Sequence, residues 1–135
     1  MIVADTNSIA YLLIKGEFTE QAELVYQSDS DWVAPCLWRA EFRNILALYL
    51  RKNYLSLADL KTIMFQAEDL MRLKEYEIDS EAILSLVSQC SLSAYDCEYV
   101  VLAQKLNINL ITSDKKILKS FPNITFSLKD YRSNQ

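Results

Sequence analysis

Residues 2–8 read Ile-Val-Ala-Asp-Thr-Asn-Ser, and this stretch decides how the fold begins. Ile2–Ala4 is a short apolar run of the kind that forms a buried strand. Asp5–Ser8 is a cluster of turn and helix-capping residues, and Ile9 and Leu13 follow it at helical spacing. The stretch therefore predicts a strand that leads through a cap directly into a helix.

Beyond this unit, short apolar stretches alternate with longer helical patterns. Strands are expected at Trp32–Ala34, closed by Pro35, and at Tyr76–Ile78, Asn109–Thr112 and Ile124–Phe126. Helices are expected at Leu37–Lys52, from a capping sequence at Ser56 to about Leu73, at Ser80–Cys90, at Ala94–Leu106 and in a short segment after Asp114. This alternation predicts an α/β fold with a parallel sheet of about five strands sandwiched between helices, and ligands at the carboxyl ends of the strands.

The length and composition suit one hydrophobic core, because the chain has 135 residues and 51% of them are hydrophobic. We therefore expect a single domain spanning residues 1–135. No apolar run approaches the length that a bilayer requires, and no basic stretch with a cleavage site stands at the N-terminus. These features predict a soluble, cytoplasmic protein with no membrane partner.

Two absences narrow the chemistry. The sequence has no histidine, which excludes Ser-His-Asp and Cys-His catalysis, histidine-ligated metals and histidine-assisted RNA cleavage. Its single glycine, Gly16, cannot build a glycine-rich phosphate loop. Cys36, Cys90 and Cys97 indicate neither a zinc site nor a disulfide framework, and we interpret them as buried thiols. Carboxylate chemistry remains.

The net charge is −4, from 14 basic and 18 acidic side chains, which by itself argues against a nucleic-acid partner. The basic residues are nevertheless concentrated in two stretches, residues 37–52 and 105–135, and each stretch contains a candidate acid, Glu41 or Asp114. If four candidate acids held a divalent metal, the remaining charges would balance. The objection to a phosphate-bearing partner is then weaker.

Two carboxylates interrupt the apolar faces of predicted helices. In the helix at 37–52 the apolar stripe runs through Leu37, Glu41, Ile45 and Leu48. In the helix at 94–106, Asp96 stands in a stripe with Leu92, Tyr99, Val100, Ala103 and Leu106. Burial penalises a charge unless a partner or a metal compensates it, so both acids are candidates for a functional site. The alternative is that each acid lies at the edge of its stripe and reaches solvent.

Asp5 and Asp114 each follow a predicted strand and precede a helix. Taken alone, each has an ordinary alternative role as a helix N-cap. Together with Glu41 and Asp96, they can converge on one point above a parallel sheet. Oxygen ligands of this kind suit Mg²⁺ or Mn²⁺, which also bind phosphate oxygens, so the four acids point to a phosphodiester enzyme.

The segments that carry these acids also form an ordered set of motifs. The set comprises Ile2–Asn7, Pro35 followed by Glu41 and Leu46, Tyr95-Asp96 leading into Tyr99–Ala103, and Leu110–Asp114. In this order and spacing it resembles the PIN-domain family, specifically the small toxin ribonucleases of the VapC type, over essentially the whole chain. The resemblance implies a PIN-like fold.

It also implies which residues form the site. The catalytic and metal-binding quartet would be Asp5, Glu41, Asp96 and Asp114, with Asn7 and Thr112 as polar neighbours. The alternatives are a turn residue for Asn7 and a β-branched strand residue for Thr112. The family's further acids vary, and this chain has lysines after Asp114, while Glu98 points to a different helix face from Asp96, so binding of one metal or of two stays open.

Several basic residues lie near the acids in sequence and are candidates for contact with an RNA backbone. They are Arg43, Lys115 and Lys116, and with them Arg39 and Lys119. The alternative is that these are solvated surface charges.

The resemblance further implies a reaction and partners. The reaction is hydrolysis of an RNA phosphodiester by a water that Mg²⁺ or Mn²⁺ activates, leaving a 5′-phosphate and a 3′-hydroxyl. Such toxins are neutralised by an antitoxin protein and commonly form homodimers. Apolar residues for these surfaces, unless they lie in the core, are Tyr11, Leu12, Leu50, Tyr54 and Leu55. The alternative functions are a non-toxin PIN nuclease in RNA processing, a catalytically silent PIN-like binding module, and an aspartyl-phosphate phosphotransferase that uses Asp5.

Overall fold

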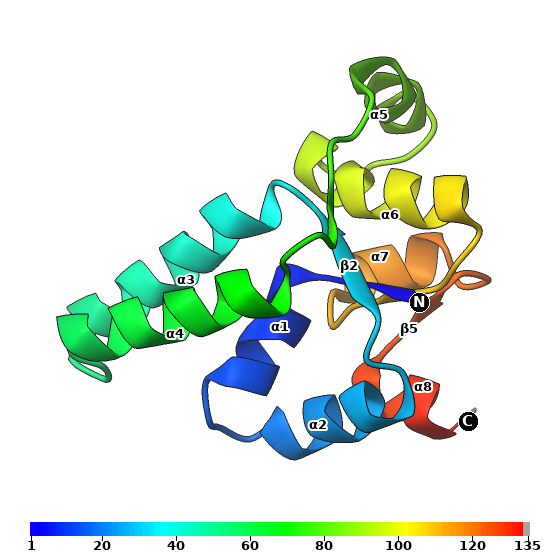
Figure 1. Ribbon diagram of the computed structural model, residues 1–135. Coiled ribbons are helices and arrows are strands. Elements are labelled where there is room, and N and C mark those ends of the chain that lie inside the picture. The colour runs from blue at the N-terminus through cyan, green and yellow to red at the C-terminus, as the bar shows by residue number, and fades with distance from the viewer. Residues whose placement is uncertain (134–135) are drawn as a thin grey trace.

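A parallel sheet forms the centre of the protein in the computed structural model, which describes residues 1–133 (Figure 1). Its strands are β1 (Ile2–Ala4), β2 (Trp32–Pro35), β3 (Glu75–Tyr76), β4 (Leu110–Ile111) and β5 (Thr125–Phe126). They lie in the order β3-β2-β1-β4-β5, and every neighbouring pair is parallel. The predicted fold class is confirmed.

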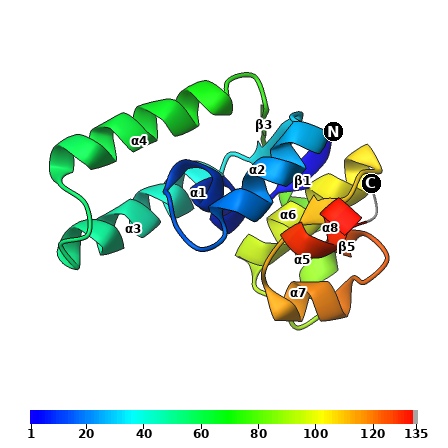
Figure 2. The same cartoon turned by 90° about the horizontal axis from the view of Figure 1, so that it is seen from below.

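Helices flank the sheet and extend beyond it. They are α1 (Thr6–Leu13), α2 (Thr19–Ser28), α3 (Trp38–Arg51), α4 (Leu57–Leu70), α5 (Ser80–Val87), α6 (Ala94–Leu106), α7 (Lys115–Ser120) and α8 (Leu128–Ser133). Helix α6 packs on β1, β2 and β4, with α5 against α6. Helices α1, α2 and α8 lie on the other side, while α3 and α4 form a hairpin that projects away from the sheet (Figures 1 and 2). None of the helices within residues 1–133 is both long and apolar enough to cross a membrane.

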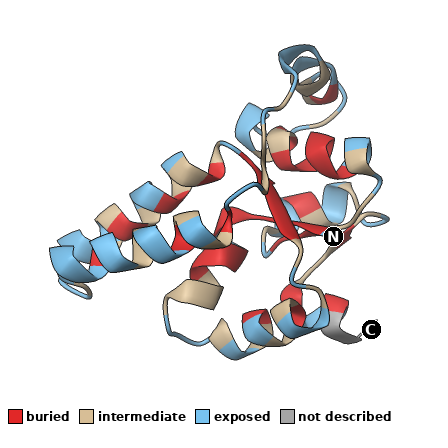
Figure 3. Ribbon diagram, viewed as in Figure 1, coloured by how far each residue is buried: buried red, intermediate tan, exposed pale blue. Residues whose placement is uncertain are grey.

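The inner strands are apolar throughout because helices lie on both sides of the sheet. All residues of β1, β2 and β4 are buried (Figure 3). The α3–α4 hairpin becomes exposed toward its tip, where local bonds fix the start of α4. There Ser56 and Asp59 form a capping box, in which each side chain accepts a hydrogen bond from the backbone N–H of the other.

The structure also differs from the sequence-based expectations. Helices α2 and α8 were not predicted, because α2 buries only Ala22 and Val25 and so has a weak apolar pattern, and α8 has only six residues. The interpretation of the cysteines as buried thiols is wrong for Cys36, which is exposed, and correct for Cys97, while Cys90 is half-buried.

The strand order marks one position in the sheet where ligand binding is expected. Along the sheet, β2 and β3 follow β1 on one side, and β4 and β5 lie on its other side. The chain therefore reverses its direction of travel across the sheet between β1 and β4, where Ala4 pairs with Ile111. In open α/β sheets, ligands bind in the crevice outside the carboxyl ends of the strands at such a point.

Candidate active site

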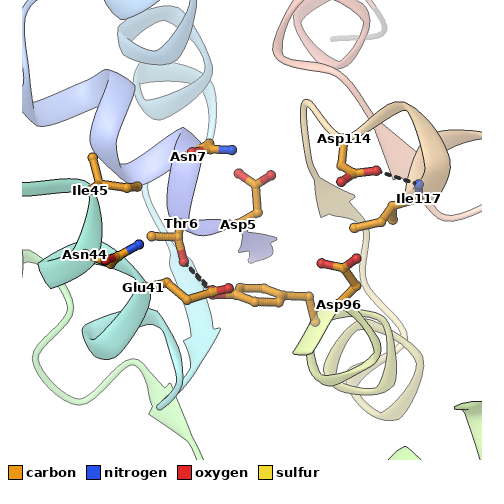
Figure 4. A pocket seen from close by; sticks show the side chains of 10 residues that line it. Asp5, Thr6, Asn7, Glu41, Asn44, Ile45, Asp96, Asp114 and Ile117 are labelled. Atoms are coloured by element: carbon orange, nitrogen blue, oxygen red, sulfur yellow. Dashed lines mark hydrogen bonds between the residues drawn. The ribbon is translucent and has the colours of Figure 1, made fainter. Parts of the chain in front are cut away.

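A cavity of about 260 Å³ lies at the carboxyl ends of β1 and β4 (Figure 4). The four predicted carboxylates all line it, and they come from four separate parts of the sequence. The full lining comprises Asp5, Thr6, Asn7, Glu41, Asn44, Ile45, Asp96, Tyr99, Asp114 and Ile117. Asp5 and Glu41 lie on one side of the cavity, and Asp96 and Asp114 on the other.

Asp5 directly follows β1 and is only 9% exposed. Its Oδ1 accepts a hydrogen bond from the N–H of Ser8 at 2.8 Å, so it caps α1, and its Oδ2 accepts one from the N–H of Ser113 at 3.3 Å. Burial raises the pKa of Asp5, against the opposing influence of Ser8, Thr112 and Ser113. The N-cap role is therefore real, but capping alone does not require a carboxylate to be buried beside a cavity.

Glu41 lies at the edge of the buried face of α3. The predicted stripe through Leu37, Glu41, Ile45 and Leu48 is wrong: the buried residues of α3 are Trp38, Phe42 and Leu46, and Leu48 is 46% exposed. Trp38 and Phe42 each follow a residue of the predicted stripe by one position, and their rings occupy the core. Glu41 is therefore turned to the edge of the buried face.

Two hydroxyl groups hold Glu41 by the same oxygen. Its Oε1 accepts hydrogen bonds from Thr6 Oγ1 at 2.8 Å and from the Tyr99 hydroxyl at 2.7 Å. The two hydroxyl oxygens lie 2.6 Å apart. Burial and the charge of Glu41 raise the pKa of Tyr99 well above its usual range, so this hydroxyl stays protonated and continues to donate.

Asp96 and Asp114 lie near each other on the side of the cavity opposite Asp5 and Glu41 (Figure 4). Asp96 is in the first turn of α6, where burial and then the nearby charges of Asp114 and Glu41 raise its pKa. Asp114 caps α7, because its Oδ1 accepts hydrogen bonds from the N–H groups of Lys116 and Ile117 at 2.8 and 3.1 Å. These acids repel one another, and a bound cation would relieve this repulsion.

The donor set fits a hard divalent cation that keeps part of its water shell. Within residues 1–133, no three or more carboxylate or thiol groups form a cluster that could by itself hold a metal ion. In that same part of the chain, Asp114 Oδ2 and Glu41 Oε2 have no hydrogen-bond partner, whereas the other oxygen of each side chain does. Mg²⁺ typically binds through one or two carboxylates and retains waters, so it needs no complete protein cage.

The two predicted polar neighbours take different positions. Asn7 lines the cavity and is exposed, whereas Thr112 is fully buried behind it. Thr112 Oγ1 accepts a hydrogen bond from the N–H of Asp114 at 3.0 Å, and the Thr112 side chain lowers the pKa of Asp5. Thr112 therefore connects two of the four acids.

The predicted RNA-contacting residues separate in space. Lys116 lies close enough for its charge to lower the pKa of Asp96. Arg43 instead lines an apolar hollow between α3 and α4, because two residues after Glu41 a helix has turned by roughly 200°. Arg39 is engaged with Glu68 and Glu75, and Lys119 is exposed. Lys115 lines a separate hollow together with Tyr11 and Phe18.

Five of the lining residues were not predicted as parts of the site: the apolar Ile45 and Ile117, and the polar Thr6, Asn44 and Tyr99. Thr6 and Tyr99 hold Glu41, and Asn44 faces the cavity one helical turn after Glu41. The signal for Asn44 was its position three residues from a candidate acid on the same helix, which puts both on one face. Thr6 and Tyr99 are 93 residues apart, and their contact depends on the tertiary fold.

The protein is thus an α/β protein with a parallel sheet and a carboxylate-lined cavity where the strand order reverses. The family model described as PIN domain matches residues 2–122, and the chain belongs to that family.

Individual relatives resemble the chain over most of its length. It is 24% identical to Ribonuclease VapC3 of Pyrobaculum aerophilum over 124 residues, which cover 90% of this chain and 95% of the relative. The solved structure of PAE2754 from the same organism matches with a TM-score of 0.78 at 15% identity, over 98% of this chain and 94% of that one. FitAcB from Neisseria gonorrhoeae matches with a TM-score of 0.74 at 18% identity, over 96% and 99% of the two chains.

Proposed function

We propose that this protein is an endoribonuclease that depends on Mg²⁺ or Mn²⁺ and acts as the toxin of a toxin–antitoxin pair. The observation that carries the proposal is the convergence of Asp5, Glu41, Asp96 and Asp114 on one cavity at the reversal of the strand order. Membership of the PIN-domain family and the name Ribonuclease VapC3 of a relative support the reaction class.

Asp5, Glu41, Asp96 and Asp114 would hold the cation together, one or two of them directly and the others through waters that the cation retains. Other residues of the chain position these acids or contact the substrate. When bound, the cation supplies a Lewis acid and lowers the pKa of a water for attack on the phosphodiester. Thr6 and Tyr99 fix one oxygen of Glu41, which leaves the other oxygen for a ligand. Thr112 and the N–H of Ser113 hold the position of Asp114 and Asp5. Lys116, near Asp96, is suited to contact a phosphate oxygen of the substrate.

The toxin role and the partners rest on relatives. One solved structure with the same fold is a toxin–antitoxin complex from Klebsiella pneumoniae, with a TM-score of 0.66 at 16% identity, over 95% of this chain and 98% of that one. We therefore propose an antitoxin protein as a partner. We also propose homodimer formation, which the resemblance to the toxin ribonucleases implies, and a cytoplasmic location, which the sequence predicts. Of the apolar residues considered for these surfaces, Leu50 and Tyr54 are 39% and 68% exposed, whereas Tyr11, Leu12 and Leu55 are half-buried against the core.

Cleavage of RNA by the purified protein tests the proposal. We expect cleavage with Mg²⁺ or Mn²⁺, none in excess chelator, and recovery when metal is restored. Asp5→Asn and Asp96→Asn should each lower the rate by orders of magnitude, because each removes an anionic ligand with little change in shape. The matched control is Asp69→Asn, which neutralises an exposed aspartate on α4 remote from the cavity and should cleave normally. Cleavage at an undiminished rate in excess chelator would contradict the metal mechanism.

A further inference from the structure

A second hollow adjoins the carboxylate cavity and is lined by aromatic rings. It encloses about 430 Å³ between α1, the loop that leads into α2, and α3. It shares Asn7 and Ile45 with the carboxylate cavity, so the two hollows lie side by side. Its rings belong to Tyr11, Phe18 and Tyr49.

The loop between α1 and α2 presents these rings in a fixed position. Thr19 Oγ1 donates to the carbonyl of Tyr11 at 2.6 Å and accepts a hydrogen bond from the N–H of Gly16 at 3.0 Å. The rings of Tyr11 and Phe18 lie 5.0 Å apart between centroids. Phe18 is nevertheless 40% exposed, although phenylalanine side chains are usually buried. The ring is thus held in place while a large part of it faces solvent.

Charge is distributed unevenly around the Tyr11–Phe18 pair. On one side, in the aromatic hollow, Glu17 is the only charged residue of the lining within residues 1–133. On the other side the same two rings line a hollow of about 250 Å³ whose lining includes Lys115, the residue that follows Asp114. The aromatic hollow therefore suits a neutral planar group, and Lys115 offers a contact for an anion nearby.

We propose that the Tyr11–Phe18–Tyr49 surface binds an unpaired nucleobase of the RNA strand whose scissile phosphate lies at the carboxylates, with Lys115 contacting the strand's phosphate. This proposal rests on the ribonuclease function proposed above and makes single-stranded RNA the substrate. Every base has a π-face that can stack on an aromatic ring, and stacking requires that the base leave its duplex. The position of the hollow directly beside the carboxylate cavity and the nearby lysine favour a nucleotide over an apolar peptide segment as the occupant.

The test compares ring-deleted variants in binding and in cleavage. A fluorescent single-stranded oligoribonucleotide and an RNA duplex of the same sequence are titrated in chelator, where cleavage does not interfere, and anisotropy is measured. We expect the wild type to prefer the single strand, and Phe18→Ala and Tyr49→Ala each to weaken that binding about tenfold. Phe18→Trp should keep the affinity, because a ring remains. Phe65→Ala is the matched control, since Phe65 is 70% exposed on α4 and lies outside the hollow.

Cleavage kinetics then separate this inference from the proposed function. With metal present, Phe18→Ala should raise KM and leave kcat unchanged, as expected for an interaction made equally before and during the reaction. Unchanged affinity and KM in both ring-deleted variants, or no preference of the wild type for the single strand, would overturn the nucleobase site and leave the hollow to a protein partner. If the rings govern RNA binding but metal supports no cleavage, the proposed function fails and the binding site stands.

Discussion

Glu41 illustrates at the scale of one residue how a carboxylate can be oriented before any ligand arrives. Thr6 and Tyr99 both donate to Oε1, and Tyr99 is buried while Glu41 is only half-buried. Partners of this kind fix the rotamer of a metal-ligating side chain, and their loss typically weakens metal binding or activity by about 10- to 100-fold. The two hydroxyls should therefore matter for activity although neither is an anionic ligand.

Tyr99→Phe tests this orientation. The variant keeps the buried ring and loses only the hydroxyl, so we expect a fold like that of the wild type, a cleavage rate about 10-fold lower or less, and a higher metal concentration for half-maximal rate. Metal titrations of the cleavage rate measure the change. Tyr95→Phe is the control, because Tyr95 is on the same helix and is 63% exposed. An unchanged metal requirement in Tyr99→Phe would show that the hydroxyl only packs.

The sequence predicted correctly which four acids line the cavity, but it did not predict correctly how Glu41 is positioned. Asp5 and Asp114 were predicted at strand ends, and both lie there and also cap helices. The sequence predicts that Glu41 interrupts the buried face of α3, yet Glu41 lies at the edge of that face. A one-residue shift of the helical face could not be predicted, because Leu37 and Ile45 are apolar as well and only tertiary packing decides which row is buried.

At the scale of elements, Arg39 ties the α3–α4 hairpin to the sheet edge. Its guanidinium binds Glu75 of β3 through Nε and Nη2, at 2.8 and 2.7 Å, and also pairs with Glu68 of α4. The hydrogen bonds from Arg39 hold the pKa of Glu75 below its usual value. A depressed pKa in the folded state means that the stabilisation is present above the unfolded pKa and is lost as the pH falls through the folded pKa.

Arg39→Met is expected to lower the free energy of unfolding at neutral pH by about 1 kcal/mol, since solvent partly screens this pair. The difference from the wild type should shrink as the pH falls below 4.5, the ordinary value for Glu75, because the protonated acid no longer attracts the guanidinium. Urea unfolding at several pH values measures this. The control is Arg72→Met, whose ion pair with Asp69 is more exposed and should contribute less. A difference that stays constant across the pH range would contradict the ion-pair account.

The alternation of strands and helices was predictable, but the strand order was not. Within residues 1–133 the apolar runs predicted a strand at or overlapping each of the five strands, although β4 and β5 are shorter than expected. The prediction for β3 is largely wrong, because the strand lies at Glu75–Tyr76 and shares only Tyr76 with the predicted Tyr76–Ile78. The placement of β1 between β2 and β4 depends on which faces the helices cover, above all α6, which is buried from Cys97 to Ala103 except at Glu98. That information is spread over the chain and appears in no local pattern.

At the scale of the whole molecule, the protein without a bound cation carries an electrostatic cost at its candidate active site. Burial and the charges of Asp114 and Glu41 raise the pKa of Asp96. A raised folded-state pKa favours folding below the unfolded pKa, and this contribution is lost as the pH rises through the folded pKa. At neutral pH without metal, the ionised form of Asp96 therefore opposes folding, and a bound cation should reverse this effect.

Thermal unfolding of the wild type, Asp96→Asn and Glu41→Gln, each in chelator and in millimolar Mg²⁺ or Mn²⁺, tests most directly whether the four acids form one metal site. In chelator, both variants should be at least as stable as the wild type, because each removes one of the repelling charges. Metal should raise the Tm of the wild type by binding only the folded state, by about 4 °C for each kcal/mol of binding free energy, and should raise the Tm of the variants much less. If both variants are clearly less stable in chelator and respond to metal as the wild type does, the acids are structural and the active-site assignment is wrong.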